Sequence, residues 1–88
     1  MPRYEIALAP AAARALRKLD PPVARRVARR LDRLRHDPRP ADARLLHGDP
    51  PGLLRIRTGD WRVVYRVDDG RVTVLVVAIG HRSRIYRR

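Results

Sequence analysis

The residues in this sequence best suited to chemistry are arginines at alternate positions, followed by a tyrosine near the C-terminal end. Four of these arginines lie on two neighbouring predicted strands: Arg55, Arg57, Arg62 and Arg66. Because alternate residues of a strand point to one face, we expect the four guanidinium groups on the same side of a hairpin. A guanidinium presents five donors in a rigid fork that suits phosphate oxygens. The pattern therefore indicates a site for a phosphate-containing substrate.

Arg82 and Tyr86 follow the last predicted strand, and together with the arginine cluster they suit cleavage of RNA without a metal. Tyr86 would take the proton of a 2′-hydroxyl, while the arginines would stabilise the charge that develops on the phosphorane. A free tyrosine titrates near ~10, and neighbouring arginines favour its phenolate. Two alternatives stay open. Strand arginines such as Arg57 and Arg66 can simply be solvated, and Tyr86 can pack the tail against the fold.

Several other kinds of site are excluded by what the sequence lacks. The chain has no cysteine, which excludes a disulfide scaffold, a thiolate zinc site and thiol catalysis. It also has no phosphate-binding glycine loop, no His-Glu-x-x-His and no Gly-x-Ser-x-Gly motif. Three histidines are expected in loops, without the spacing of metal ligands: His36, His47 and His81. We therefore expect neither a metal nor another cofactor.

The charge of the chain points to a polyanionic partner. The 88 residues include 21 Lys and Arg against 9 Asp and Glu, a net charge of +12. Residues 1–54 carry 12 basic and 6 acidic side chains and residues 55–88 carry 9 and 3, so the excess is evenly spread. Because such self-repulsion destabilises a small domain, it implies a nucleic acid, an acidic protein or both as partner.

The elements that position these residues follow from the apolar periodicity. Residues 4–8 alternate like a half-buried strand, and Pro10 begins a helix whose apolar positions extend to Leu19. Asp20 is expected to cap a second helix, whose apolar stripe runs to Leu34 and whose outer face is rich in arginine. That outer face is expected to be solvated or to contact RNA electrostatically. The connection is very short, so the helices form an antiparallel hairpin.

A loop over residues 36–52, long enough to hide a short strand around residues 44–46, precedes an antiparallel meander of three strands. The last strand, residues 71–79, is almost entirely apolar, like a central strand covered on both faces. We expect one α+β domain over residues 1–88, in the order β-α-α-β-β-β, with a two-helix hairpin packed on one face of a mostly antiparallel sheet. The predicted core comprises Ile6, Leu8, Leu16, Leu19, Val27, Leu31 and Val63 or Tyr65. The other sheet face should be partly apolar and rimmed with arginine.

Nothing in the sequence predicts contact with a membrane. The longest apolar run, residues 72–79, is far too short to span a bilayer. The first residues contain no apolar segment of the kind found in a signal peptide. We expect a cytoplasmic protein.

Two segments carry a more specific pattern. Residues 46–65 contain Arg-x-Arg-x-Gly-Asp-Trp-Arg-x-x-Tyr, and residues 74–86 run from an apolar strand through Gly80-His81-Arg82 to Ile85-Tyr86. With the order of elements, they resemble the RelE branch of the RelE/ParE toxin superfamily over essentially the whole chain. This resemblance implies the toxin of a type II toxin–antitoxin pair, a metal-independent endoribonuclease that cleaves mRNA in the ribosomal A site and inhibits translation. Its partners would be the ribosome, mRNA and a cognate antitoxin with an acidic or amphipathic binding segment.

The resemblance also implies roles for individual residues. Arg55 and Arg62 match residues that bind and stabilise the scissile phosphate, Arg82 matches the proposed general acid, and Tyr86 matches the proposed general base. Four further residues are expected to bind RNA: Arg57, Arg66, His81 and Arg84. Two alternatives remain open, namely a ParE-like toxin of the same fold that targets DNA gyrase without ribonuclease chemistry, and an inactive basic RNA-binding module. Retention of Arg62, Arg82 and Tyr86 favours the ribonuclease, since the resemblance implies that ParE-type members usually lack this set.

Overall fold

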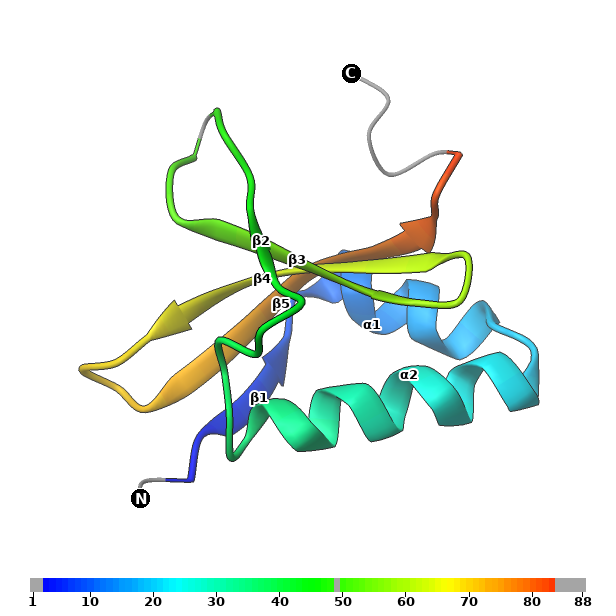
Figure 1. Cartoon of the computed structure of the whole chain (residues 1–88). Helices are drawn as coiled ribbons and strands as arrows, with labels where there is room; N and C mark the ends of the chain where they lie inside the picture. Colours follow the sequence, from blue (N-terminus) through cyan, green and yellow to red (C-terminus); the bar gives the residue numbers. More distant parts are fainter. Residues whose placement is uncertain (1–2, 49, 84–88) are drawn as a thin grey trace.

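The computed structural model describes residues 3–48 and 50–83, which form two helices and a five-stranded sheet (Figure 1). In chain order the elements are β1 (Glu5–Leu8), α1 (Pro10–Lys18), α2 (Pro21–Leu34), β2 (Arg44–Leu45), β3 (Leu53–Thr58), β4 (Trp61–Asp68) and β5 (Thr73–His81). The strand order is β1-β5-β4-β3-β2, and all neighbours are antiparallel except the parallel pair of β1 and β5. The predicted α+β fold is confirmed, and the strand expected within the long loop is β2.

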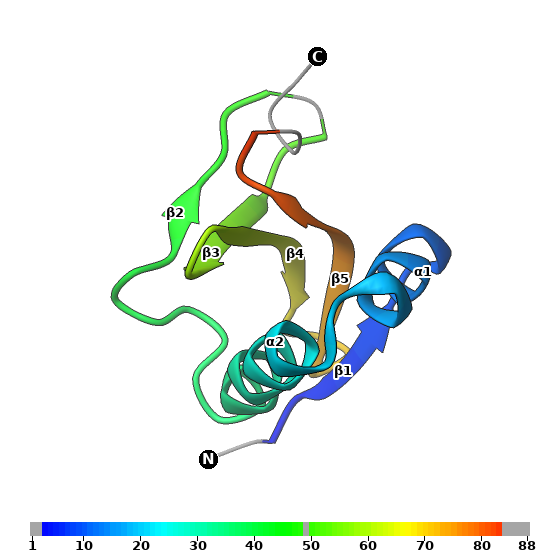
Figure 2. The same ribbon diagram turned by 90° about the vertical axis from the view of Figure 1, so that its right-hand side faces the viewer.

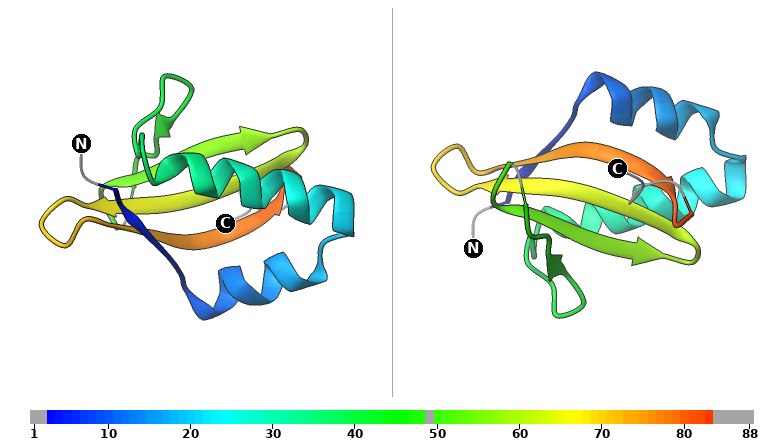
Figure 3. Two further views of the ribbon diagram at one scale, coloured as in Figure 1. Left: turned by 90° about the horizontal axis from the view of Figure 1, so that it is seen from below. Right: turned by 90° about the horizontal axis from the view of Figure 1, so that it is seen from above.

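Both helices lie on one face of the sheet and leave the opposite face open (Figures 2 and 3). Pro10 and Pro21 each begin a helix, where the missing N–H removes no hydrogen bond. Asp20 occupies the cap position of α2, but its side chain makes no capping hydrogen bond, so the predicted cap is wrong. The physical reason is that a capping side chain accepts a hydrogen bond from the second or third N–H of the helix, and Pro22, at the second position, has no N–H to donate. In the described residues, neither helix is long and apolar enough to cross a membrane.

The core lies between the two helices and the covered face of the sheet. Its buried residues are Ala12, Val27, Leu31, Leu34, Ile56, Val63, Tyr65, Val74, Val76 and Ile79. Four predicted core residues are only partly buried and pack at its margin: Ile6, Leu8, Leu16 and Leu19. α2 contributes Val27, Leu31 and Leu34 to this core and α1 contributes Ala12, and burial of one large aliphatic side chain contributes about 1.5–3 kcal/mol.

The turns between the three long strands each contain a residue with positive φ. Gly59, with φ of 62°, begins the predicted two-residue turn between β3 and β4. Between β4 and β5, Val72 has φ of 50°, a strained conformation for a β-branched residue. The Val72 carbonyl accepts the Glu5 N–H at 2.9 Å, and the Val72 N–H donates to the Asp69 carbonyl at 3.3 Å. This turn delays the start of β5 to Thr73, two residues later than predicted.

An irregularity in β5 decides which of its side chains face the helices. Consecutive residues of β4 pair with Val76 and with Ala78, so Val77 is an extra residue in β5. A bulge of this kind shifts the alternation of side chains by one position. Val76, before the bulge, and Ile79, after it, are therefore both buried in the core, at 0% and 7% exposure. In a regular strand, residues three positions apart would point to opposite faces. Beyond the bulge, the even-numbered positions face the open side.

Polar contacts tie the loop between α2 and β2 to the rest of the fold. The Tyr65 hydroxyl donates to the Pro38 carbonyl at 2.8 Å, and burial raises the pKa of Tyr65 to about 12. Arg39 donates to both carboxylate oxygens of Asp69, at 3.2 and 2.9 Å, and the Tyr4 hydroxyl donates to the same carboxylate at 2.6 Å. The hydrogen bonds from Arg39 and Tyr4 hold the pKa of Asp69 below its usual range. These contacts direct the chain toward β2.

Candidate nucleic-acid interface

The open face of the sheet carries the arginines on which the sequence analysis centred. Ile56 of β3 and Val63 of β4 lie opposite each other and are 0% exposed beneath the helices. Because side chains alternate along a strand, the residues adjacent to them in sequence point to the other face. That face bears all four strand arginines: Arg55, Arg57, Arg62 and Arg66. The prediction that they share one side of the β3–β4 hairpin is confirmed.

Several of these arginines face one another across strands. Arg57 of β3 lies directly opposite Arg62 of β4, and Arg44 of β2 lies directly opposite Arg55 of β3. Like charges in directly opposite positions destabilise a sheet. Within residues 3–48 and 50–83, no ion pair includes Arg44, Arg55 or Arg57. An anion bound across these strands would relieve the repulsion, so the open face is a candidate site for phosphate groups.

The floor of this face is apolar. Val64 points to the open side but is only 6% exposed. It lies opposite Arg55 on one neighbouring strand and opposite Ala78 on the other, and Arg62 and Arg66 flank it along β4. Arginine stems lie along apolar surface while their charged heads reach water, which explains the burial of Val64. An apolar floor with guanidinium planes around it suits an unstacked RNA base as well as its phosphate.

Arg82 lies at one end of the open face. Its backbone N–H donates to the Asp60 carbonyl at 2.8 Å, and its Nε lies 3.9 Å from the Asp60 carboxylate. Asp60 belongs to the turn that joins β3 to β4, so Arg82 lies beside the strand ends that bear Arg57 and Arg62. The Arg82 side chain is 64% exposed and therefore accessible to a substrate. Two predicted site residues, Arg84 and Tyr86, lie outside the described residues.

His81 does not join the arginines. The sequence analysis placed it in a loop and among the RNA-binding residues, but it is the last residue of β5 and lies opposite Trp61. The two rings meet edge to face with their centroids 5.5 Å apart. Both line a hollow of about 670 Å³ on the helix side of the sheet, together with Lys18 at the end of α1 and Leu19 after it. The predicted loop position of His81 is therefore wrong, because pairing with Trp61 extends β5 to this residue, and its contact with RNA stays a prediction.

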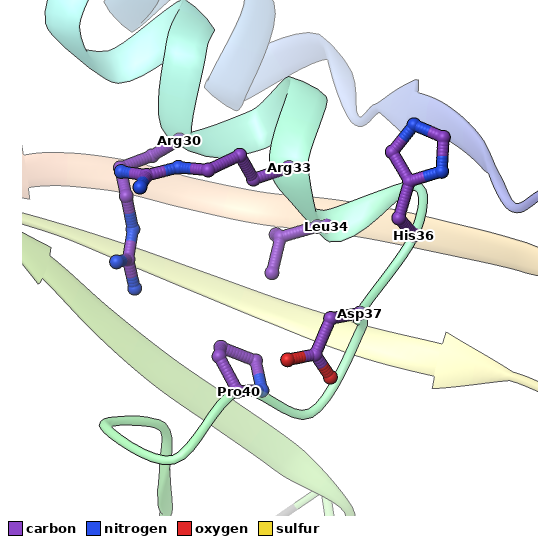
Figure 4. Close-up of a pocket in the computed structure, with 6 residues that line it drawn as sticks. All are labelled: Arg30, Arg33, Leu34, His36, Asp37 and Pro40. Atoms are coloured by element: carbon purple, nitrogen blue, oxygen red, sulfur yellow. The ribbon is translucent and has the colours of Figure 1, made fainter.

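A second hollow, of about 340 Å³, lies between the end of α2 and the loop that follows it (Figure 4). Its lining residues are Arg30, Arg33, Leu34, His36, Asp37 and Pro40. Arg30 extends from α2 along this hollow and donates to both carboxylate oxygens of Asp42, at 3.0 and 2.8 Å. The Arg30 guanidinium holds the pKa of Asp42 below its usual range. The ion pair fixes the loop two residues before β2 begins.

Sequence reasoning missed Arg44 as a member of the arginine face. The signal was present, because a strand was expected around residues 44–46 and a hairpin with β3 brings one of its residues opposite Arg55. The part of the chain that the structure describes contains no group of three or more His, Asp or Glu residues that could hold a metal ion. The arginine face is therefore the candidate site that the geometry favours.

Comparison with known proteins identifies the family of this chain. Residues 6–86 match the family model described as ParE toxin of type II toxin-antitoxin system, parDE. The chain belongs to this toxin family. A segment covering 48% of the chain is 48% identical, over 42 residues, to Toxin RelE of Mycobacterium tuberculosis. The segment spans only 43% of that relative. The matched family region includes the whole arginine face of this RelE-type toxin.

Solved structures place the toxin in the RelE branch by its fold. The RelBE2 toxin–antitoxin complex of Mycobacterium tuberculosis contains a chain with a TM-score of 0.82 and 28% identity, aligned over 94% of this chain and 95% of that one. The archaeal RelE–RelB complex from Pyrococcus horikoshii OT3 contains a chain with a TM-score of 0.80 and 28% identity, aligned over 93% and 98%. The two-helix, five-stranded architecture of this RelE-type toxin is thus the one seen in both complexes.

Proposed function

We propose that this RelE-type toxin is a metal-independent endoribonuclease that cleaves mRNA in the ribosomal A site and so inhibits translation. The observation that carries the proposal is the set of facing arginines on the open side of the sheet, with Arg57 opposite Arg62 and Arg55 beside them. Donors that are already in place where negative charge develops stabilise a transition state, and each is worth roughly 10²–10³ in rate. RelE toxins of known structure share this fold.

The proposed chemistry is transfer of the phosphate to the neighbouring 2′-oxygen. Tyr86 accepts the proton of the 2′-hydroxyl, the 2′-oxygen bonds to phosphorus, and the bond from phosphorus to the 5′-oxygen breaks. Arg55 and Arg62 bind the phosphate and stabilise the added negative charge of the phosphorane. Arg82, next to Asp60 at the end of this face, delivers a proton to the departing 5′-oxygen. The products are a 2′,3′-cyclic phosphate and a 5′-hydroxyl.

The same proposal includes a cognate antitoxin as partner. Two of the similar structures are complexes of a toxin with an antitoxin. The net charge of +12 favours an acidic binding segment, and the partly apolar open face favours an amphipathic one. Because a ligand that binds only the folded state stabilises it, mixing with the product of the adjacent gene should raise the melting temperature, and the rise should grow with the logarithm of the partner's concentration. Absence of a tight complex would contradict this part of the proposal.

The proposed activity is tested by expression of the chain without antitoxin, with mRNA ends mapped against the reading frame. Cuts at a constant position within codons, which disappear when translation initiation is blocked, are expected. Tyr86→Phe removes one hydroxyl and keeps the ring, so cleavage by purified protein on programmed ribosomes should fall by about 10²–10⁴-fold. A Tyr86→Phe protein that cuts at the normal rate would remove Tyr86 from the mechanism.

A second candidate function is inhibition of DNA gyrase without cleavage of RNA, and the description of the matching family model favours it. The same expression experiment separates the two functions. Growth arrest with a DNA-damage response and intact mRNA would select gyrase. Growth arrest in step with codon-phased cuts selects the ribonuclease.

A further inference from the structure

We propose that Arg44, on the edge strand β2, binds the phosphate next to the scissile one, so that the open face holds two successive phosphates of one RNA strand. The inference rests on the proposed function, because it extends the same face by one strand. β2 lies at the edge of the sheet beside β3 (Figure 1). Neither the arginine pattern of the long strands nor the family resemblance assigns a role to this residue.

The register of β2 brings Arg44 to the open face. Arg44 lies directly opposite Arg55, which points away from the helices, so the two side chains share one side of the sheet. Directly opposite residues have Cβ atoms about 4.5–5.5 Å apart, so Arg44 can donate to a phosphate beside the scissile one that Arg55 binds. Arg44 is exposed, and among the described residues no ion pair includes it or Arg55. A phosphate would relieve the repulsion between the two arginines.

The position of Arg44 matches a phosphate next to the scissile one. Arg44 lies one strand beyond Arg55, on the side of β3 away from Arg62. Neighbouring strands are about 5 Å apart, which is the scale of one nucleotide in an RNA strand. Arg82 lies at the end that bears Arg57 and Arg62. The scissile phosphate therefore belongs to that end, and Arg44 binds the next one.

Arg44 is held in place from both sides along the chain. Before β2, the Arg30 guanidinium binds Asp42 through two hydrogen bonds, and the Arg30 side chain is only 18% exposed. After β2, the Leu46 N–H donates to the Leu53 carbonyl at 2.8 Å, which continues the pairing with β3. A donor that is fixed in this way loses little conformational entropy when it binds a ligand. Arg44 is thus pre-positioned for its phosphate.

The first test compares Arg44→Ala with Arg71→Ala in cleavage of mRNA on programmed ribosomes. Arg71 lies in the turn between β4 and β5, and its side chain is 86% exposed, so its loss makes the same charge change away from the open face. Arg44→Ala should raise KM about tenfold, the value of a hydrogen-bonded charge contact, with kcat changed by less than about twofold. Arg71→Ala should change KM by less than about twofold. Equal effects of the two variants, or a loss in kcat alone, would overturn the proposal.

The second test locates the phosphate. Messenger RNAs are synthesised with a neutral methylphosphonate in place of the phosphate on either side of the scissile one. For the wild-type protein, one of these two replacements should raise KM about tenfold, and the same replacement should have no further effect on Arg44→Ala. Fully additive effects at both positions would show that Arg44 contacts neither phosphate. Arg44→Lys keeps the charge without the fork, so its KM should lie between those of wild type and Arg44→Ala.

Binding of a single-stranded RNA oligonucleotide separates failure of this inference from failure of the proposed function. The wild-type dependence of log affinity on log salt should be steeper than that of Arg44→Ala by about 0.7, the contribution of one phosphate contact. If the wild-type protein binds this RNA with that difference but never cuts mRNA, the proposed function fails and the phosphate contact stands. If it cuts mRNA and the two salt dependences coincide, the function stands and the Arg44 contact is wrong.

Discussion

The two faces of the sheet differ in side-chain charge: the covered face is apolar and the open face carries arginines. On the covered face, apolar residues such as Ile56 and Val63 lie opposite each other and are 0% exposed. On the open face, one residue nearer the β3–β4 turn on each strand, Arg57 lies opposite Arg62. The first arrangement stabilises the fold through burial, and the second opposes it through repulsion. β3 and β4 therefore carry the apolar side chains that stabilise the domain on one side, and on the other the arginines that we propose bind phosphate.

The acidic residues follow the same division. The ion pairs among the described residues are Arg30–Asp42, Arg35–Asp32, Arg39–Asp69, Arg71–Asp68 and Arg82–Asp60. Four of these pairs stabilise α2, its following loop or the β4–β5 turn, and only the pair with Arg82 adjoins the open face. The carboxylates therefore neutralise arginines that hold segments together. The arginines that face one another across β2 and β3 keep their charge available for a ligand.

The largest expected effect is a loss of cleavage rate when an arginine of the open face is removed, compared with an arginine on the outer surface of α2. Arg62→Ala should reduce cleavage on programmed ribosomes by about 10²–10³-fold, because it removes donors aimed at developing charge. Arg26 is an exposed arginine on α2 that projects from the helix into solvent, so Arg26→Ala makes the matched charge change. It should at most weaken ribosome binding in a salt-dependent way. Single-turnover rates check both variants, and equal losses would contradict a special role for the open face.

A change on the covered face should affect stability without touching the chemistry. Leu31 of α2 is 6% exposed and packs in the core, so Leu31→Ala should lower the free energy of unfolding by about 3 kcal/mol. Urea titration followed by circular dichroism measures this loss. The cleavage rate per folded molecule should equal that of wild type at a temperature where both proteins are folded. A proportionate loss of cleavage at full folding would show that the two faces are not independent.

Removal of the Tyr65 hydroxyl, on the same covered face, should lower the free energy of unfolding by less than Leu31→Ala does. Tyr65→Phe keeps the ring in the core but removes the hydrogen bond to the Pro38 carbonyl, and the free energy of unfolding should fall by about 1 kcal/mol. Tyr4→Phe is the matched control, because the Tyr4 hydroxyl bonds to Asp69 at an exposed position. Its cost should be smaller, since water replaces an exposed hydrogen bond readily. A larger loss for Tyr4→Phe in denaturant titrations would reverse this ranking.

The smallest expected effect concerns the ion pair before β2. Arg30 lowers the pKa of Asp42, so the folded state favours the carboxylate more than the unfolded state does. The resulting stability is present above the unfolded pKa of about 3.9 and is lost as the pH falls through the lower folded pKa. Asp42→Asn should therefore destabilise the protein slightly at pH 7 and flatten the decline of stability below about pH 4. Chemical denaturation from pH 2 to 7 measures both, and an unchanged acid profile would mean that the pair contributes nothing.

Local patterns in the sequence determined the helices, the β3–β4 hairpin and the arginine face. The apolar stripe of α2 repeats with the period of a helix, and the arginines of β3 and β4 alternate with apolar residues on both sides of the turn at Gly59. Period and turn chemistry act over a few residues, so they are visible in sequence. They suffice to place Arg55, Arg57, Arg62 and Arg66 on one face of the sheet.

Pairing between distant segments decided the positions of Arg44 and His81. Arg44 gained its place opposite Arg55 because β2, only two residues long, adds to the edge of β3. His81 faces the helices because of the bulge at Val77, in a strand that is almost entirely apolar. When both faces of a strand are apolar, its sequence carries no alternation that specifies which side chains point inward. The register then depends on hydrogen bonds to β4 and on packing against the helices, which exist only in the folded chain.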